Sequence, residues 1–95
     1  MLVGSLQLSV RLDGCRSLKE KRRARLSLSD RIRARWKIAV AEVADQDTWD
    51  LLTLGVGAVG ADDAPVAQVL EDVARFVEHS GVGELIDDEV IVEKR

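Results

Sequence analysis

The chain has 95 residues, 46% of them hydrophobic, with one cysteine, three aromatic residues and a formal net charge of −3. This length predicts one domain, residues 1–95, and the hydrophobic content excludes a disordered chain. A single cysteine excludes an internal disulfide and a zinc site built from cysteines. No stretch resembles a signal peptide or the ~20 apolar residues of a membrane span, so we expect a cytoplasmic protein without membrane contact.

The small net charge hides a strong separation of charge along the chain. Residues 11–37 hold eleven of the fourteen Lys and Arg and three Asp and Glu, a net charge of +8. All other residues together carry −11. Such a separation predicts a dipolar molecule with one face that attracts polyanions.

Residues 2–12 alternate strictly, which predicts a half-buried β-strand. The inward face would hold the apolar residues at even positions, Leu2, Leu6, Leu8, Val10 and Leu12. The Asp13-Gly14 pair that follows is typical of a turn.

Residues 16–37 predict a basic amphipathic helix. Ser17 and Glu20 have the spacing of a capping box, in which the Ser17 hydroxyl accepts from the Glu20 N–H and the Glu20 carboxylate reaches back to the Ser17 N–H. Helical periodicity predicts one apolar stripe that contains Leu18, Leu28, Ile32 and Trp36. Ala24 lies at the edge of this stripe. Lys21 and Arg25 lie close to that stripe, where they either cover the edge of the core or line a partner site.

The second half of the chain predicts three more strands and a second helix. Strands are expected at residues 37–43, 48–59 and 85–93, and in the last of these Ile86 shares a side with Val90 and Val92. Acidic residues and Pro65 mark a helix start near residue 62, apolar residues follow at helical spacing, and Ser80-Gly81 ends it. The charges at 87–89 suit an edge strand.

The order β-α-β-β-α-β predicts an α+β, ferredoxin-like fold with a four-stranded antiparallel sheet and both helices on one face. The open face of such a sheet would keep the apolar residues Val3, Trp49, Leu51 and Val59, and Ile91 is a further candidate. An apolar open face favours a homodimer or a protein partner.

Several sequence blocks resemble the YlxP-like family of small bacterial proteins, which is also catalogued as a domain of unknown function. The blocks are R-S-L-K-E-K-R-R (16–23), S-L-S-D-R-I-R-A-R-W (27–36), V-A-E-V (40–43), Q-D-T-W (46–49) and T-L-G-V (53–56). The resemblance covers nearly the whole chain. It implies a ferredoxin-like fold, a bacterial cytosolic protein, and a gene often found near those for initiation factor two and ribosome-binding factor A. That neighbourhood favours a role in ribosome maturation or translation.

The basic helix predicts a surface for RNA or a ribosomal subunit, because clustered Lys and Arg neutralise phosphates. The residues expected to contact phosphates are Arg16, Lys19, Lys21, Arg22, Arg23, Arg25, Arg31, Arg33 and Arg35. The alternative is a solvated helix whose charges pair with the protein's own acids. Base stacking on the sheet is not expected, because three aromatic residues are too few for a stacking platform.

No phosphate loop, nucleophile-base pair or metal motif is present, so we expect no enzyme, cofactor, metal or small-molecule substrate. Asp45, Asp47 and Asp50 lack the spacing of a calcium loop and are expected to serve a hairpin turn. We expect Asp47 to pair with Arg22 or Arg16. Two hypotheses therefore remain, an RNA- or ribosome-binding protein and a protein-interaction or self-assembling module.

Overall fold

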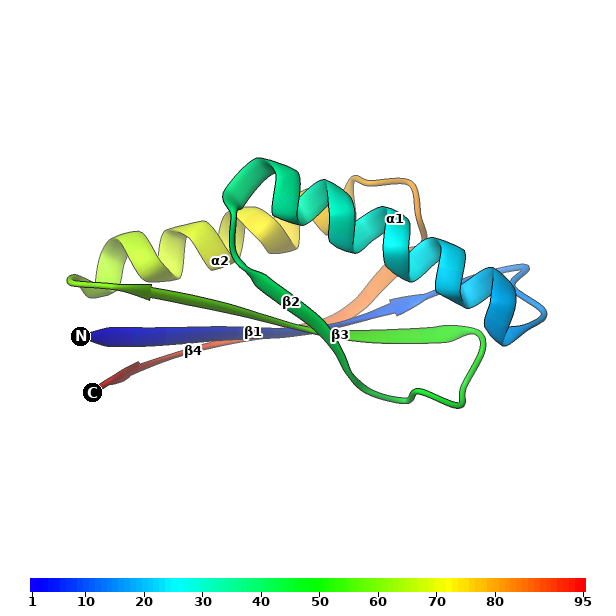
Figure 1. Ribbon diagram of the computed structural model, residues 1–95, viewed down its shortest axis with the longest axis horizontal. Coiled ribbons are helices and arrows are strands. Elements are labelled where there is room, and N and C mark those ends of the chain that lie inside the picture. Colours follow the sequence, from blue (N-terminus) through cyan, green and yellow to red (C-terminus); the bar gives the residue numbers. More distant parts are fainter.

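The computed structural model describes residues 1–95 and contains the six expected elements in the expected order (Figure 1). They are β1 Leu2–Arg11, α1 Leu18–Trp36, β2 Ala39–Ala44, β3 Leu51–Gly60, α2 Asp63–Glu78 and β4 Glu84–Lys94. The strands form one sheet in the order β2-β3-β1-β4, and every neighbouring pair is antiparallel. Both helices cover the same face and the other face is open (Figure 1). The chain thus has the ferredoxin-like α+β fold that its sequence predicts.

The core lies between the sheet and the helices. The alternation predicted for β1 is confirmed, because the residues at positions 6, 8, 10 and 12 are buried and their odd-numbered neighbours face away. β3 contributes Leu52, Leu54 and Val56, and α2 contributes Val66, Leu70, Val73 and Val77. This apolar surface, removed from water, is the main source of the fold's stability.

The first helix packs less completely than the second. Its fully buried apolar residues are Leu28 and Ile32, and its other buried residues are Lys21 and Ser29. The expectation that Leu18 faces the core is wrong, because 49% of its surface is exposed. In the first turns of α1 the fully buried residue is Lys21 instead, which reaches Glu42 on β2. Neither helix combines the length and the apolarity needed to span a membrane.

The hairpin strands β2 and β3 begin later than the sequence predicts, at Ala39 and Leu51 rather than at residues 37 and 48. Lys37 adopts a left-handed conformation, with φ of 52°, and its N–H donates to the Arg33 carbonyl to end α1. Residues 48–50 belong to the loop before β3, where the Thr48 N–H donates to the Asp45 carbonyl. Trp49 therefore lies on a loop and not on the sheet.

A β-bulge in β4 corrects the predicted sides of that strand. Asp87 lies opposite Ser9, whereas Leu85 lies opposite Val10, so Ile86 is the extra residue between them. The bulge brings Leu85 to the core side with Val90 and turns Ile86, 43% exposed, away from it. Strict alternation cannot reveal an inserted residue. The prediction that β4 is a charged edge strand is confirmed.

The close approach of β1 to the residues just before β4 predicts a sensitive site at Gly83. A Cβ built there would overlap the carbonyl oxygen of Arg11 and lie 2.7 Å from Val10 Cγ1. Because a backbone atom cannot rotate away, Gly83→Ala is expected to lower the free energy of unfolding by about 1–3 kcal/mol.

Urea unfolding would measure this effect, with Gly57→Ala as the matched control. A Cβ on Gly57 would have no heavy atom within 4 Å, so this variant should stay within about 0.5 kcal/mol of the wild type. Equal stability of the two variants would contradict the steric explanation.

Candidate nucleic-acid interface

The N-terminus of α1 is fixed by a capping box that differs in one contact from the predicted one. The Glu20 N–H donates to Ser17 Oγ at 3.1 Å, as expected. The Glu20 carboxylate accepts from the N–H of Arg16 at 2.6 Å, and not from that of Ser17. Both bonds satisfy donors that the helix start would otherwise leave free. They hold Arg16 at the exposed end of the basic helix.

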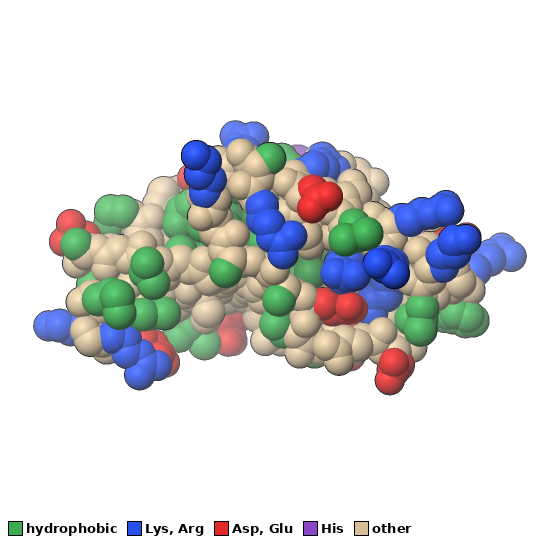
Figure 2. Space-filling model, in the orientation of Figure 1, with side chains coloured by type: hydrophobic (Ala, Val, Ile, Leu, Met, Phe, Trp, Pro, Cys, Tyr) green, Lys and Arg blue, Asp and Glu red, His purple; other side chains and the backbone are tan.

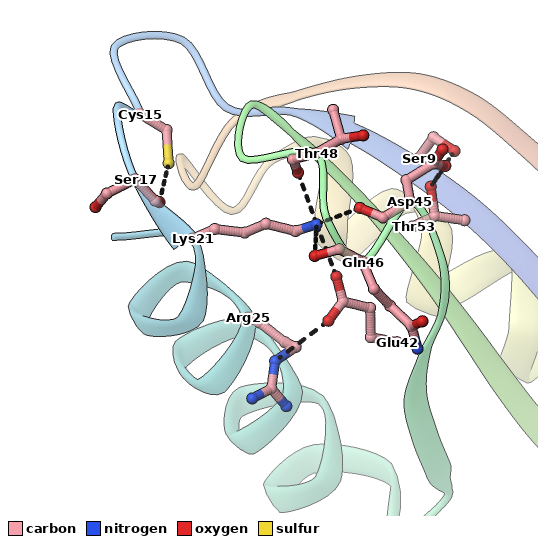
Figure 3. Close-up of polar contacts among 10 residues, drawn as sticks. All are labelled: Ser9, Cys15, Ser17, Lys21, Arg25, Glu42, Asp45, Gln46, Thr48 and Thr53. Atoms are coloured by element: carbon pink, nitrogen blue, oxygen red, sulfur yellow. Dashed lines mark hydrogen bonds and ion pairs between the residues drawn. The ribbon is translucent and has the colours of Figure 1, made fainter. Parts of the chain in front are cut away.

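Lys21 does not belong to the exposed basic surface, although the sequence includes it among the phosphate contacts. Only 2% of its surface is exposed, and its ammonium points into the β2–β3 hairpin loop (Figure 3). Nζ donates to the carbonyl oxygens of Asp45 at 2.6 Å and Thr48 at 2.7 Å, with that of Gln46 at 3.5 Å. Its charge is balanced by Glu42, whose Oε2 lies 2.8 Å away. The three protons of the ammonium are occupied.

Arg25 shares the same carboxylate from the next turn of α1. Its Nε lies 3.7 Å from Glu42 Oε1, and its side chain is 31% exposed. Glu42 Oε2 is buried and has no hydrogen-bond partner. Its principal interaction is therefore charge attraction to the Lys21 ammonium. Of the two interpretations open for Lys21 and Arg25, the structure thus favours packing against the protein's own sheet.

The acidic loop after β2 is organised by backbone carbonyls and hydroxyls rather than by ion pairs with α1. Asp45 has a φ of 56°, and its Oδ2 accepts from Thr53 Oγ1 at 2.7 Å. Thr53 Oγ1 in turn lies 3.1 Å from Ser9 Oγ on β1 (Figure 3). The expected ion pair of Asp47 with Arg22 or Arg16 is wrong, because Asp47 forms no salt bridge. No group of three acidic, His or Cys side chains could hold a metal ion.

The remaining basic residues of α1 lie on the surface, and most have no acidic partner. The space-filling view shows Lys and Arg side chains spread along this helix, from the upper left to the far right (Figure 2). Exposed basic residues that form no salt bridge are Arg16, just before the helix, and Lys19, Arg22 and Arg23 on its first half. These four charges are therefore available to an external anion.

The basic residues on the second half of α1 contact backbone carbonyls and aromatic rings, which carry no net charge. Arg31 donates to the carbonyl of Ser80 at 3.3 and 3.4 Å, and Arg33 donates to that of Val40 at 2.6 Å. The guanidinium of Arg35 lies over the ring of Trp36. Carbonyls and rings orient these cations without cancelling their charge, and only Arg33 has a weak acidic neighbour, Asp30 at 3.9 Å. We call the seven exposed residues the basic face: Arg16, Lys19, Arg22, Arg23, Arg31, Arg33 and Arg35.

The apolar residues expected on the open sheet face do not form one patch. Val3 pairs with Val59 at one end of the sheet, and Leu51 pairs with Arg11 at the other. The two positions are eight residue steps apart along β1, which is about 26 Å in an extended strand. Trp49 lies on the loop near Leu51 and is 52% exposed. Small and polar residues fill the middle of this face, among them Ser5, Gln7, Ser9, Gly55 and Gly57.

Comparison with known proteins agrees with this architecture. The family model described as "Protein of unknown function (DUF503)" matches residues 3–90. The chain is also 29% identical to the "Uncharacterized protein YlxP" of Bacillus subtilis (strain 168), over 62 residues that cover 65% of this chain and 67% of that protein. The match spans both helices and nearly the whole sheet. The chain therefore belongs to this family of proteins of unknown function and is YlxP-like.

Proposed function

We propose that this protein is a non-enzymatic, cytoplasmic RNA-binding protein that associates with ribosomal RNA through the basic face of α1. The observation that supports this most is the lack of internal partners. Four exposed basic residues at the start of the helix and just before it form no salt bridge, although the chain outside residues 11–37 carries a net charge of −11. These four charges are not neutralised within the protein and are free to meet an external polyanion.

The arrangement favours contact with phosphates rather than readout of base edges by hydrogen bonds. The cations project from a rigid helix, and the sheet offers no row of aromatic residues on which bases could stack. Binding of this kind depends on the backbone and shape of the RNA and releases counterions. The gene neighbourhood that the family resemblance implies favours a ribosomal particle as the source of that RNA.

Sedimentation of bacterial ribosomal particles through a density gradient tests the proposal. At low salt the protein should travel with a ribosomal subunit, and at high salt it should stay at the top of the gradient. Loss of the association after ribonuclease treatment would attribute it to RNA. Absence from every particle fraction at low salt would contradict the ribosomal assignment.

A second candidate function is protein binding or self-assembly through the open sheet face. Its support is the exposure of Val59 and Ile91, which are 68% and 46% exposed at the same end of the sheet as Val3. This candidate predicts a dimer that Ile91→Lys converts to a monomer, measured by light scattering at high concentration. A wild-type protein that remains monomeric would exclude self-assembly.

A further inference from the structure

A cavity of about 400 Å³ lies between the C-terminal halves of α1 and α2, beside the basic face. Its walls come from both helices, which bring together residues about 40 positions apart in the sequence. The lining residues are Arg35, Trp36, Asp72, Arg75, Phe76 and His79. Aromatic rings and cationic groups therefore meet in one concave place on an otherwise aromatic-poor molecule.

The aromatic wall is built from the two rings that the core leaves half-exposed. Trp36 and Phe76 meet edge to face, with centroids 5.3 Å apart and planes at 82°. The Arg35 guanidinium lies 5.0 Å from the Trp36 centroid and 5.6 Å from that of Phe76, and the Arg31 guanidinium lies 5.3 Å from Phe76. These contacts hold two planar cations against the rings without neutralising them.

The polar wall is positive on balance. Asp72 is paired with Arg75 and also accepts from Gln68 Nε2 at 3.0 Å, which leaves the charges of Arg31 and Arg35 without a carboxylate partner. His79 Nδ1 lies 2.8 Å from the Arg75 carbonyl oxygen, so this nitrogen carries the proton that makes the bond. The other ring nitrogen, Nε2, is left for an external group, with Glu78 3.9 Å away.

We propose that this cavity binds one unpaired nucleotide of an RNA strand whose neighbouring phosphates contact the basic face. Bases in single-stranded RNA stack on aromatic rings and on guanidinium planes, and Arg35 with Trp36 offers both surfaces. The adjoining phosphate is bound by the cationic side chains of Arg31 and Arg35. A volume of about 400 Å³ lies within the range of small-ligand sites, whereas a duplex would present no free base to the rings. This inference rests on the proposed function and names the class of RNA feature that the protein recognises.

Tryptophan fluorescence provides a direct test, because the chain has only two tryptophans, Trp36 and Trp49. In the Trp49→Phe variant every signal comes from Trp36, which lines the cavity. Titration with a single-stranded hexaribonucleotide should quench this signal in a saturable way. Inorganic polyphosphate should not quench it, because it supplies the charge without a base. A duplex of the same sequence should bind with little quenching.

Two substitutions of Arg35 distinguish the stacking contribution to binding from the charge contribution. Neither changes the partly buried rings of Trp36 and Phe76. Arg35→Gln should weaken hexanucleotide binding about 10-fold, within the range for one stacked base. Arg35→Lys should keep a phosphate contact but weaken the stacking interaction, because lysine has no planar head group. The comparison variant is Arg23→Gln, which removes one phosphate contact of the basic face outside the cavity. It should weaken hexanucleotide binding, but it should leave the quenching at saturation unchanged.

Three outcomes would overturn the inference, and they differ from a failure of the proposed function. Tight RNA binding that does not quench Trp36 fluorescence would show that the helix binds phosphates and that the cavity is not a nucleotide site. An equal loss of hexanucleotide affinity in Arg35→Gln and Arg23→Gln would show the same. Binding of adenosine monophosphate as tight as that of the hexanucleotide would make the cavity a site for a free nucleotide. No binding of any RNA would remove the proposed function as well.

Discussion

Lys21→Met is expected to lower the free energy of unfolding by about 3–5 kcal/mol, because it removes one partner of a buried ion pair. The ammonium now balances Glu42 and binds the carbonyl oxygens of Asp45 and Thr48. Methionine fills the space of the aliphatic stem, but it leaves the carbonyls of Asp45 and Thr48 without this donor. It also leaves the Glu42 carboxylate with only the more distant Arg25 as a counter-charge. A domain of this kind is stable by only about 5–15 kcal/mol, so the loss is a large share of the total.

Urea unfolding measures this effect, with Lys19→Met as the matched control. Lys19 lies on the same helix, is exposed and forms no salt bridge, so its replacement should change stability by no more than about 0.5 kcal/mol. Adding Glu42→Gln to Lys21→Met should restore part of the loss, because the carboxylate that has lost its nearest counter-charge is then gone. If Lys21→Met proves as stable as Lys19→Met, Lys21 does not hold the hairpin loop to α1.

Reversal of two charges on the basic face, Arg22→Glu with Arg23→Glu, is expected to weaken binding of single-stranded RNA about 100-fold at 50 mM salt. Each lost phosphate contact with a single strand removes the release of about 0.7 counterion, and the new carboxylates repel the RNA. Both arginines are exposed and form no salt bridge, so stability should change little. Fluorescence anisotropy of a labelled oligoribonucleotide measures the affinity, and circular dichroism confirms the fold.

The control for this pair is Lys94→Glu with Arg95→Glu, which changes the net charge by the same amount at the end of β4. These residues are exposed and lie at the last position of β4 and just after it, away from α1 (Figure 1). Affinity should fall only slightly, through the long-range field of the protein. Equal losses for the two double variants would show that net charge, and not the basic face, governs binding.

The fold was largely predictable because its signals are local. The alternation at residues 2–12, the capping pair at Ser17 and Glu20, and the periodicity of α2 each depend on neighbours close in the sequence. The bulge at Ile86 was not predictable in this way, since one inserted residue reverses the sides of a strand without changing its composition. The late start of β3 was also hidden, because Trp49 continues the alternation of the strand although residues 48–50 are held in the loop.

The charge of the candidate site was predictable from the sequence. Which of its basic residues are exposed and which are buried was not. The sequence shows eleven basic residues in one segment, but it cannot show that Lys21 points into the hairpin loop. That contact joins positions 24 to 27 residues apart through backbone carbonyls, which carry no side-chain signal. The one available signal was the position of Lys21 on the apolar stripe of the helix. The cavity between α1 and α2 was equally hidden, because it requires the packing that brings Trp36 to Phe76.

The dependence of RNA affinity on salt tests the central claim most directly, which is that the exposed basic residues of α1 bind phosphates. If four of them each contact one phosphate of a single strand, the logarithm of the affinity should fall with a slope of about −3 against the logarithm of the salt concentration. Between 50 and 200 mM salt this is a loss of about 60-fold. The Arg22→Glu, Arg23→Glu variant should show a shallower slope. An affinity that does not change over this range would contradict the claim.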